Sequence, residues 1–255
     1  MTLLAGELYL LRLKRCDQVE VYDTISYHLL RCLTVSGICS VADMTSCKHY
    51  RCVYIGDHIS RCVHSLDEQG STTSWNVSNV PSGLSVNGAH NVMVTCRFVR
   101  KVKEFSSHGD LLRVLTLPDD VINPFHAIQT RSGQFLICHG DRDDPVHRVC
   151  TVSSDGRHIV HSHGGQRGPN AGQYDVPRHL AVDDNEFVFV SDLDNRRVTL
   201  LSPTLEYVRQ VVSPDQLNWR PRRLYLDTER KLFYVADNKF TDGWYKAGRV
   251  VAFNV

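Results

Sequence analysis

One short segment of alternating apolar and polar residues recurs along the whole chain. Its six copies are ELYLLR at 7–12, CVYIGD at 52–57, NVMVTC at 91–96, QFLICH at 134–139, FVFVSD at 187–192 and FYVAD at 233–237. Alternation over five or six positions predicts a β-strand with one face toward a core. The copies end at residues 12, 57, 96, 139, 192 and 237, so consecutive ends lie 39 to 53 residues apart. Self-similarity at this period predicts a repeat architecture.

Two further strand types follow these copies in a constant order. The second type is QVEVYD from Gln18, RCVHSL from Arg61, KVKEFS from Lys101, HRVCTV from His147, RVTLLS from Arg197 and RVVAFN from Arg249. A third type follows most of these: LLRCLTV from Leu29, LLRVLTL from Leu111 and YVRQVV from Tyr207. After a turn with Pro or Gly come the inner strands PSGLSV at 81–86, PFHAIQ at 124–129, PRHLAV at 177–182 and PRRLYL at 221–226. Each repeat therefore predicts an antiparallel meander of four strands.

A single four-stranded meander cannot bury both of its faces, whereas repeats that pack side by side bury one another. We therefore predict an all-β fold, a six-bladed β-propeller of one domain over residues 1–255. The blades are expected at about 1–35, 36–80, 81–120, 121–176, 177–219 and 220–255. In this pattern the first blade begins at its second strand and the last blade ends at its third. We therefore expect incomplete end blades, with a truncated N-terminus or imperfect closure between 1–35 and 220–255, and MTLL at most a remnant strand.

The segment VPRHLAVDDNEFVFVSDLDNRRVTLLSPTLEYV, from Val176 to Val208, resembles an NHL repeat. The resemblance rests on the proline that opens the inner strand, the VSD end of the next strand, and the Asn and Arg that precede the strand after it. The last blade is similar, while the two blades before residue 100 match mainly by spacing. In such repeats Asp192 and Asn195 are expected to pin the loop after the second strand through backbone contacts. Asp57 and Asp237 stand at equivalent repeat positions.

Composition narrows the classes of function. The 29 Lys and Arg residues against 28 Asp and Glu give a net charge of +1, so no global charge draws the chain to nucleic acid or membrane. No apolar run is long enough to cross a membrane, and Glu7 and Arg12 interrupt the apolar start. We therefore expect a soluble, cytoplasmic protein.

Cysteine and histidine usage argues against a metal. The nine cysteines lie within the first 150 residues, mostly in strand-like runs, which favours buried free thiols over disulfides. No CxxC occurs, so we expect no structural zinc. The densest histidine group is His139, His147, His158, His161 and His163. Because HSHGG precedes the turn QRGPNAG at a blade edge, we expect a solvated cluster there.

Enzymes with six-bladed propellers include metal-dependent lactonases and the amidating lyase that cleaves peptidylhydroxyglycine. In that lyase, zinc-binding histidines directly follow the prolines of the inner strands. The residues in those places here are Ser82, Phe125, Arg178 and Arg222. His126 and His179 lie one position further on, where strand alternation would send them to the opposite face. The lactonase set of Glu, Asn and Asp is not assembled either. We therefore expect no catalytic residues and no cofactor.

Loops that lead into the inner strands bring basic and aromatic residues to equivalent positions of three blades. These residues are Phe125, His126, Arg178, His179, Arg220, Arg222 and Arg223. Because loops on a rigid scaffold often carry recognition, we predict that this rim is the binding surface.

Two functions fit such a rim, and a third is weaker. The favoured one is a non-catalytic, protein-binding module for substrate recognition or scaffolding, as in the tripartite-motif ubiquitin ligases whose NHL propellers this chain resembles. The alternative is single-stranded RNA binding, in which Phe125 and the arginines would contact bases and phosphates. Lactonase or lyase activity is the third. We expect neither a membrane nor DNA as a partner.

Overall fold

The computed structural model describes residues 1–12, 15–241 and 244–254. In this part of the chain there are 23 β-strands and one short 3-10 helix, η1 (Arg97–Val99). Contacts divide the chain into two compact units, Met1–Leu115 and Thr116–Val255, each built on three sheets. None of the described residues belongs to a helix with the length and apolarity that a membrane crossing requires.

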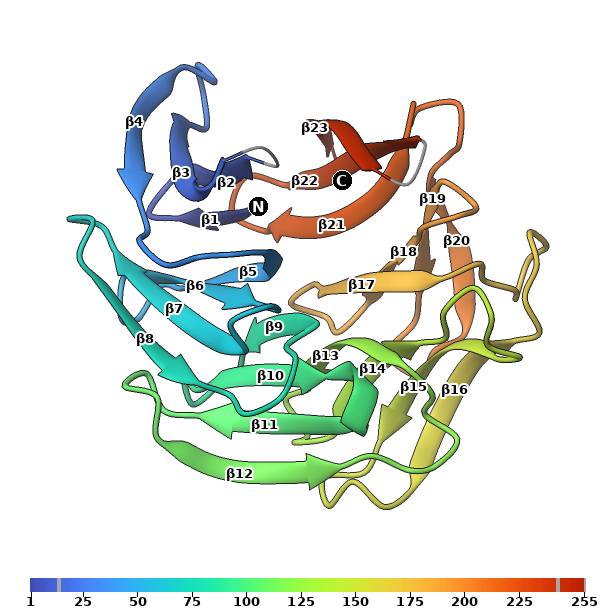
Figure 1. The fold of residues 1–255 in the computed structure, drawn as a ribbon. Coiled ribbons are helices and arrows are strands. Elements are labelled where there is room, and N and C mark those ends of the chain that lie inside the picture. The colour runs from blue at the N-terminus through green and yellow to red at the C-terminus, as the bar shows by residue number, and fades with distance from the viewer. Residues whose placement is uncertain (13–14, 242–243, 255) are drawn as a thin grey trace. The chain divides into compact units, whose positions relative to one another are not determined.

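The first unit contains three four-stranded antiparallel meanders (Figure 1). The strands of blade 1 are β1 (Thr2–Leu4), β2 (Glu7–Arg12), β3 (Arg15–Asp23) and β4 (Leu29–Thr34). Those of blade 2 are β5 (Val41–Cys47), β6 (Cys52–Asp57), β7 (Cys62–Asp67) and β8 (Thr72–Asn76). Those of blade 3 are β9 (Gly83–Val86), β10 (Val92–Cys96), β11 (Lys101–Phe105) and β12 (Leu111–Thr116). Strands that are consecutive in the chain are neighbours in each sheet, so each connection within a blade is a hairpin.

The second unit repeats this arrangement. The strands of blade 4 are β13 (Pro124–Gln129), β14 (Phe135–His139), β15 (His147–Val152) and β16 (Ile159–Gly165). Those of blade 5 are β17 (Pro177–Val182), β18 (Val188–Asp192), β19 (Arg197–Leu201) and β20 (Tyr207–Val212). Blade 6 has three strands, β21 (Arg220–Asp227), β22 (Leu232–Thr241) and β23 (Trp244–Asn254). The fold is an all-β, six-bladed β-propeller, which confirms the fold predicted from the repeat.

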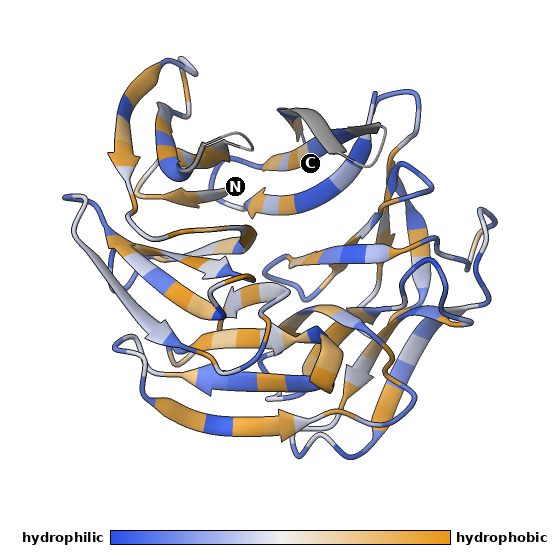
Figure 2. Cartoon of the chain, in the orientation of Figure 1, coloured by the Kyte–Doolittle hydropathy of each residue, from blue (hydrophilic) through white to orange (hydrophobic). Residues whose placement is uncertain are grey.

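Adjacent blades within each unit bury one another's apolar faces, as the alternation predicts. Figure 2 shows apolar and polar residues alternating along the strands. In the second unit, Leu136 and Val149 of blade 4 share a core with Leu180 and Val190 of blade 5. Burial of one such side chain stabilises a fold by roughly 1.5–3 kcal/mol, so the contacts between blades hold a unit together. Blades 5 and 6, 1 and 2, and 2 and 3 form cores of the same kind.

The expectation of an incomplete first blade was wrong. Thr2–Leu4 forms β1, which pairs with β2 and is buried along its whole length, so blade 1 has all four strands. Ala5 and Gly6 join the two strands and have φ values of 50° and 79°. Two consecutive residues at positive φ make the tight turn that matches the twist of a hairpin. A strand of three residues shows too little alternation to be recognised from the sequence.

The inner strand of blade 2 was also missed. Val41–Cys47 forms β5, although it lacks the proline that opens the other predicted inner strands and carries Asp43 and Thr45 among apolar residues. The three-stranded last blade agrees with the sequence-based expectation.

Candidate functional site

A β-bulge begins the inner strand of several blades and explains where the predicted rim residues lie. The register of β13 shifts between Pro124 and His126, and that of β17 shifts between Pro177 and His179. A bulge inserts one unpaired residue and interrupts the alternation of faces. The same shift recurs between Pro221 and Arg223. The simple alternation from which we expected His126 and His179 on the opposite face is therefore interrupted at these positions.

Phe125 is the extra residue of the β13 bulge, and it is buried rather than exposed. Its exposed fraction is 1%, and it belongs to the core between blades 4 and 5. The guanidinium carbon of Arg178, the extra residue of the β17 bulge, lies 4.0 Å from the centroid of its ring. Such a cation–π contact adds on the order of 0.5–2 kcal/mol. Because its ring is covered, Phe125 offers no surface on which a base could stack.

The bulges also bring His126 and His179 together. Their rings stack with centroids 4.0 Å apart and an interplanar angle of 21°, and both are buried. The N–H of Leu224 donates to Nδ1 of His179 at 3.4 Å. Burial lowers the pKa of His179 well below its usual range, and the charges of His126 and Arg223 lower it further. His179 is therefore a neutral imidazole at pH 7, placed to pack and accept a hydrogen bond.

The three arginines that open β21 separate into two groups. Arg222 is the extra residue of the β21 bulge, Arg223 follows it, and both are half-buried. Arg220 lies at the start of the strand, where its Nε is 2.9 Å from Oδ1 of Asp194. The predicted rim is thus partly an interior cluster, while Arg220 joins a network of charged loop residues through Asp194.

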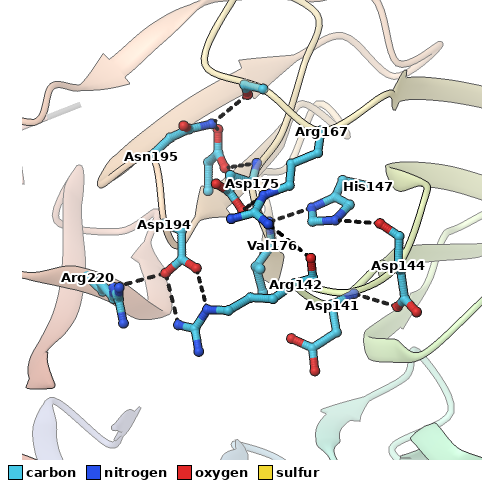
Figure 3. Close-up of polar contacts among 12 residues, drawn as sticks. Asp141, Arg142, Asp144, His147, Arg167, Asp175, Val176, Asp194, Asn195 and Arg220 are labelled. Carbon is cyan, nitrogen blue, oxygen red and sulfur yellow. Dashed lines mark hydrogen bonds and ion pairs between the residues drawn. The ribbon is translucent and has the colours of Figure 1, made fainter. Parts of the chain in front are cut away.

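Asp194 is the centre of this loop network (Figure 3). It lies in the β18–β19 turn and accepts from Nε of Arg142 at 2.6 Å and from its second terminal nitrogen at 3.1 Å, in addition to its contact with Arg220. The Asp194 side chain is 8% exposed, whereas those of Arg142 and Arg220 are 45% and 35% exposed. One shielded carboxylate therefore holds two partly exposed arginines, one from the β14–β15 loop and one from the start of β21.

Arg167 extends the network to the loop that precedes β17. Its Nε lies 2.8 Å from Oδ1 of Asp175, and one terminal nitrogen donates to the carbonyl of Arg142 at 3.0 Å. The side chain remains 46% exposed. A planar guanidinium held by two contacts has a fixed orientation, so its exposed edge presents donors in a defined direction.

Asp192 and Asn195, the predicted structural positions, hold the same loops in place through hydrogen bonds. Oδ1 of Asp192 accepts the N–H of Asp175 at 2.7 Å, and its Oδ2 accepts from Nδ2 of Asn195 and Nε of Arg197, both at 2.7 Å. Asn195 also donates to the carbonyl of Gly168 at 2.9 Å. Burial raises the pKa of Asp192 to about 6 against the opposing effect of these donors.

Blade 6 repeats this pinning with Asp237. Its carboxylate is fully buried and lies 2.9 Å from a terminal nitrogen of Arg249. The buried Asp and the arginine opposite it on the next strand are therefore a recurring device.

Two histidines of the dense group are structural and not solvated. Nδ1 of His147 accepts the N–H of Val176 at 2.9 Å, so its Nε2 carries the proton and donates to the carbonyl of Asp144 at 3.2 Å. His139 is fully buried, and Nε of Arg148 donates to its Nε2 at 3.2 Å. In HSHGG, where a solvated cluster was expected, His161 is exposed and His163 is half-buried. His139 and His147 lie outside that segment and are buried in the fold.

Sequence reasoning missed Arg142, Arg167, Asp175 and Asp194. A signal was present, because Arg142 and Asp194 stand three and two residues past the ends of β14 and β18, in corresponding loops of consecutive blades. Opposite charges in corresponding loops of neighbouring repeats predict a contact between them. The sequence pattern instead assigned the loop contacts to Asp192 and Asn195, the polar residues that recur in the repeat.

Comparisons with known proteins support the fold alone. No family model matches the chain, and no curated protein matches it. Among solved structures, a Bacteroides caccae protein of unknown function is similar with a TM-score of 0.67 and 11% identity, over 88% of this chain and 80% of that one. A streptogramin B lyase and the virginiamycin B lyase of Staphylococcus aureus each have a TM-score of 0.67 and 10% identity. Each covers 98% of this chain, which covers 80% and 81% of them respectively.

Proposed function

We propose that this chain is a non-catalytic binding module that recognises a protein partner through the loop arginines Arg142, Arg167 and Arg220. The single observation that supports this most is the pairing of each partly exposed guanidinium with a shielded aspartate. A side chain that is already ordered loses little conformational entropy when a partner binds, so preorganised arginines bind more tightly than mobile ones. The chemistry they recognise is a carboxylate or a row of backbone carbonyls.

RNA is the less favoured partner because of the charges around these arginines. Asp194 and Asp175 lie against the guanidiniums, and Asp141, Asp143 and Asp144 occupy the β14–β15 loop beside Arg142. Binding to a phosphate backbone depends on an excess of positive charge, and carboxylates in the same loops oppose it. The burial of Phe125 removes the proposed stacking surface as well.

A lyase-type activity is a second candidate, favoured by the stacked pair of His126 and His179. The similar structures include streptogramin B and virginiamycin B lyases, and an imidazole can transfer the protons that a lyase reaction requires. Burial makes His179 a weak base, and Leu224 already donates to its Nδ1, so this activity ranks below binding. Incubation of the chain with a streptogramin B antibiotic tests it. Loss of the intact compound that His179→Gln abolishes would place catalysis first.

The free thiols favour a location in a reducing compartment. The eight cysteines that the structure describes are unbridged, and such thiols persist in the cytoplasm. Recruitment of targets to a ubiquitin ligase is the use implied by the resemblance to tripartite-motif proteins. Ligase subunits among the captured proteins would support that use.

Capture from a native lysate, with and without nuclease, tests the proposal. The bait is the full chain, either unmodified, as Arg142→Glu with Arg167→Glu, or as the matched control Arg131→Glu with Arg157→Glu. Both control arginines are in the same unit, with side chains 71% and 79% exposed, and both carry exposed ion pairs. The two doubles change the net charge equally, so a difference between them reports the loop network.

We expect a protein that is retained after nuclease treatment, retained by the control and lost from the Arg142 and Arg167 double. Cross-linking should then place that protein against the β14–β15 and β16–β17 loops. A partner that disappears with nuclease would replace the proposal with RNA binding. Equal retention by both doubles would remove the arginine network from recognition.

A further inference from the structure

We propose that blade 2 holds a zinc ion, or a similar thiophilic divalent cation, between Asp57, Cys62 and His64. The inference concerns the first unit only and is independent of the proposed function. Asp57 ends β6, and Cys62 and His64 stand two residues apart on β7. Cys62 pairs directly with Asp57 in the β6–β7 register. Residues directly opposite one another, and residues two apart on a strand, share a face, so the three side chains project from one side of the sheet.

The donor atoms of the three side chains converge on one point. Sγ of Cys62 lies 3.2 Å from Nε2 of His64, and the same Nε2 lies 4.0 Å from Oδ2 of Asp57. All three atoms fall within 4.8 Å of one another. In tetrahedral zinc sites with bonds of about 2.0–2.3 Å, ligand atoms are about 3.3–3.8 Å apart, so small side-chain adjustments would complete the geometry.

A catalytic Cys–His–Asp triad explains this geometry less well. In a Cys–His–Asp arrangement the histidine uses one ring nitrogen for the thiol and the other for the carboxylate. Here Nε2 faces both the Cys62 thiol and the Asp57 carboxylate. Three donors directed at one point suit a cation.

Comparison with the other blades shows what blade 2 lacks. The residue opposite the end of the second strand is Lys101 in blade 3, Arg148 in blade 4, Arg197 in blade 5 and Arg249 in blade 6. In blades 5 and 6 that arginine pairs with a fully buried aspartate. In blade 2 the corresponding aspartate is also fully buried, but Cys62 stands where the arginine would be. Among the described residues, His64 is its sole ion-pair candidate.

The loops around Asp57 hold its carboxylate in place with five hydrogen bonds. Oδ1 accepts the N–H groups of Ser40, Ile59 and Ser60, and Oδ2 accepts the N–H of Cys39 at 2.6 Å and the Ser60 hydroxyl at 2.9 Å. These donors fix the Asp57 carboxylate on the face of the sheet that it shares with Cys62 and His64, where one of its oxygens can serve as a metal ligand.

The thiol and imidazole suit zinc more than a hard cation. Cys62 offers a sulfur atom and His64 an imidazole nitrogen, and zinc prefers both to the all-oxygen ligand sets of hard cations. Zinc would displace the thiol proton to solvent and take the lone pair of Oδ2 that the rotatable Ser60 hydroxyl now uses. Sulfur, nitrogen and one carboxylate oxygen are a zinc ligand set, and the partly exposed Cys62 leaves the fourth position to water.

Cobalt substitution tests the site directly. The full chain is stripped of metal with a chelator, then titrated with Co²⁺ and, separately, with Zn²⁺ in competition. We expect about one tight equivalent, with tetrahedral visible bands and a thiolate-to-cobalt charge-transfer band, all displaced by Zn²⁺. Cys62→Ser should remove the charge-transfer band and weaken zinc binding by at least about 100-fold, because even residues behind the ligands are worth 10- to 100-fold. Cys32→Ser, at an exposed cysteine of blade 1, is the matched control and should change neither.

Cys62→Arg keeps the test decisive if other variants fold poorly. It restores the residue of blades 5 and 6, so it should fold without metal, lose the cobalt bands and no longer gain thermal stability from Zn²⁺. The proposal is overturned if the unmodified chain shows no charge-transfer band, or if Cys62→Arg binds zinc as tightly as the unmodified chain. Neither result would bear on partner binding by the loop arginines of the second unit.

Discussion

Arg197 donates its Nε to Oδ2 of Asp192 at 2.7 Å, and the two side chains are only 12% and 0% exposed. The other nitrogens of Arg197 donate to the carbonyls of Pro169, Asn170 and Gln173. One guanidinium thus neutralises a buried carboxylate and fastens the loop that carries Arg167. The rigidity that we propose for recognition depends on this pair.

Arg197→Met should destabilise the protein by about 3–5 kcal/mol, because it leaves the Asp192 carboxylate buried without its cation. Equilibrium unfolding in urea measures the change. The control is Arg157→Met, at a side chain 79% exposed, which should leave the midpoint unchanged. Similar midpoints for both variants would mean that the Asp192 pair does not hold the fold.

His139 should make the protein sensitive to acid. Burial, with the nearby charge of Arg148, lowers its pKa from 6.5 to about 3. Below pH 6.5 the unfolded state therefore binds a proton that the folded state refuses, so stability is lost as the pH falls from 6.5 toward 3. The loss from this group amounts to about 3 kcal/mol by pH 4. Unfolding free energies at pH 7 and pH 4 should differ less in His139→Gln than in the unmodified protein, while exposed His158→Gln keeps the full difference.

Gly140 should tolerate no side chain. It has a φ of 103°, and a Cβ there would overlap the carbonyl oxygen of Val146 and lie 2.8 Å from Cα of His147. Gly133 has a φ of 81° and open space around it, so it isolates the backbone effect. We expect Gly133→Ala to cost about 1–2 kcal/mol and Gly140→Ala to cost at least about 3 kcal/mol. Thermal unfolding of the two variants checks the order, and equal costs would contradict the close approach at Gly140.

Phe125→Ala separates a core role from a recognition role. Removal of this buried ring should lower stability by about 3–5 kcal/mol. Arg178→Met removes the charge above the ring and should cost less, about 0.5–2 kcal/mol. Denaturant unfolding measures both. If Phe125→Ala were as stable as the unmodified protein, Phe125 would not be a core residue and its role in recognition would be favoured.

Periodicity predicted the fold because strand alternation and repeat spacing are properties of the whole chain. The six copies of the apolar strand are strands of the six blades, and the order of strands within each repeat was confirmed. The inner strands Thr2–Leu4 and Val41–Cys47 escaped because one is three residues long and the other lacks the opening proline. Local pattern carries little information about so short a strand.

The site was predicted less well, for a different physical reason. Bulges at Phe125 and Arg178 change which face each following residue occupies, and alternation alone cannot place a bulge. The contact of Arg142 with Asp194 joins loops 52 residues apart. Such a contact depends on how neighbouring blades are aligned, which the sequence specifies only through their packing.

The affinity of the captured partner for Arg167→Lys is the most direct test of recognition by oriented guanidiniums. Lysine keeps the charge but lacks the planar fork that Asp175 and the Arg142 carbonyl hold in place. We predict that Arg167→Lys binds the partner at least about 10-fold more weakly and that Arg157→Lys binds it unchanged. Surface plasmon resonance at physiological salt measures both affinities. Equal affinities for the unmodified protein and Arg167→Lys would contradict the account.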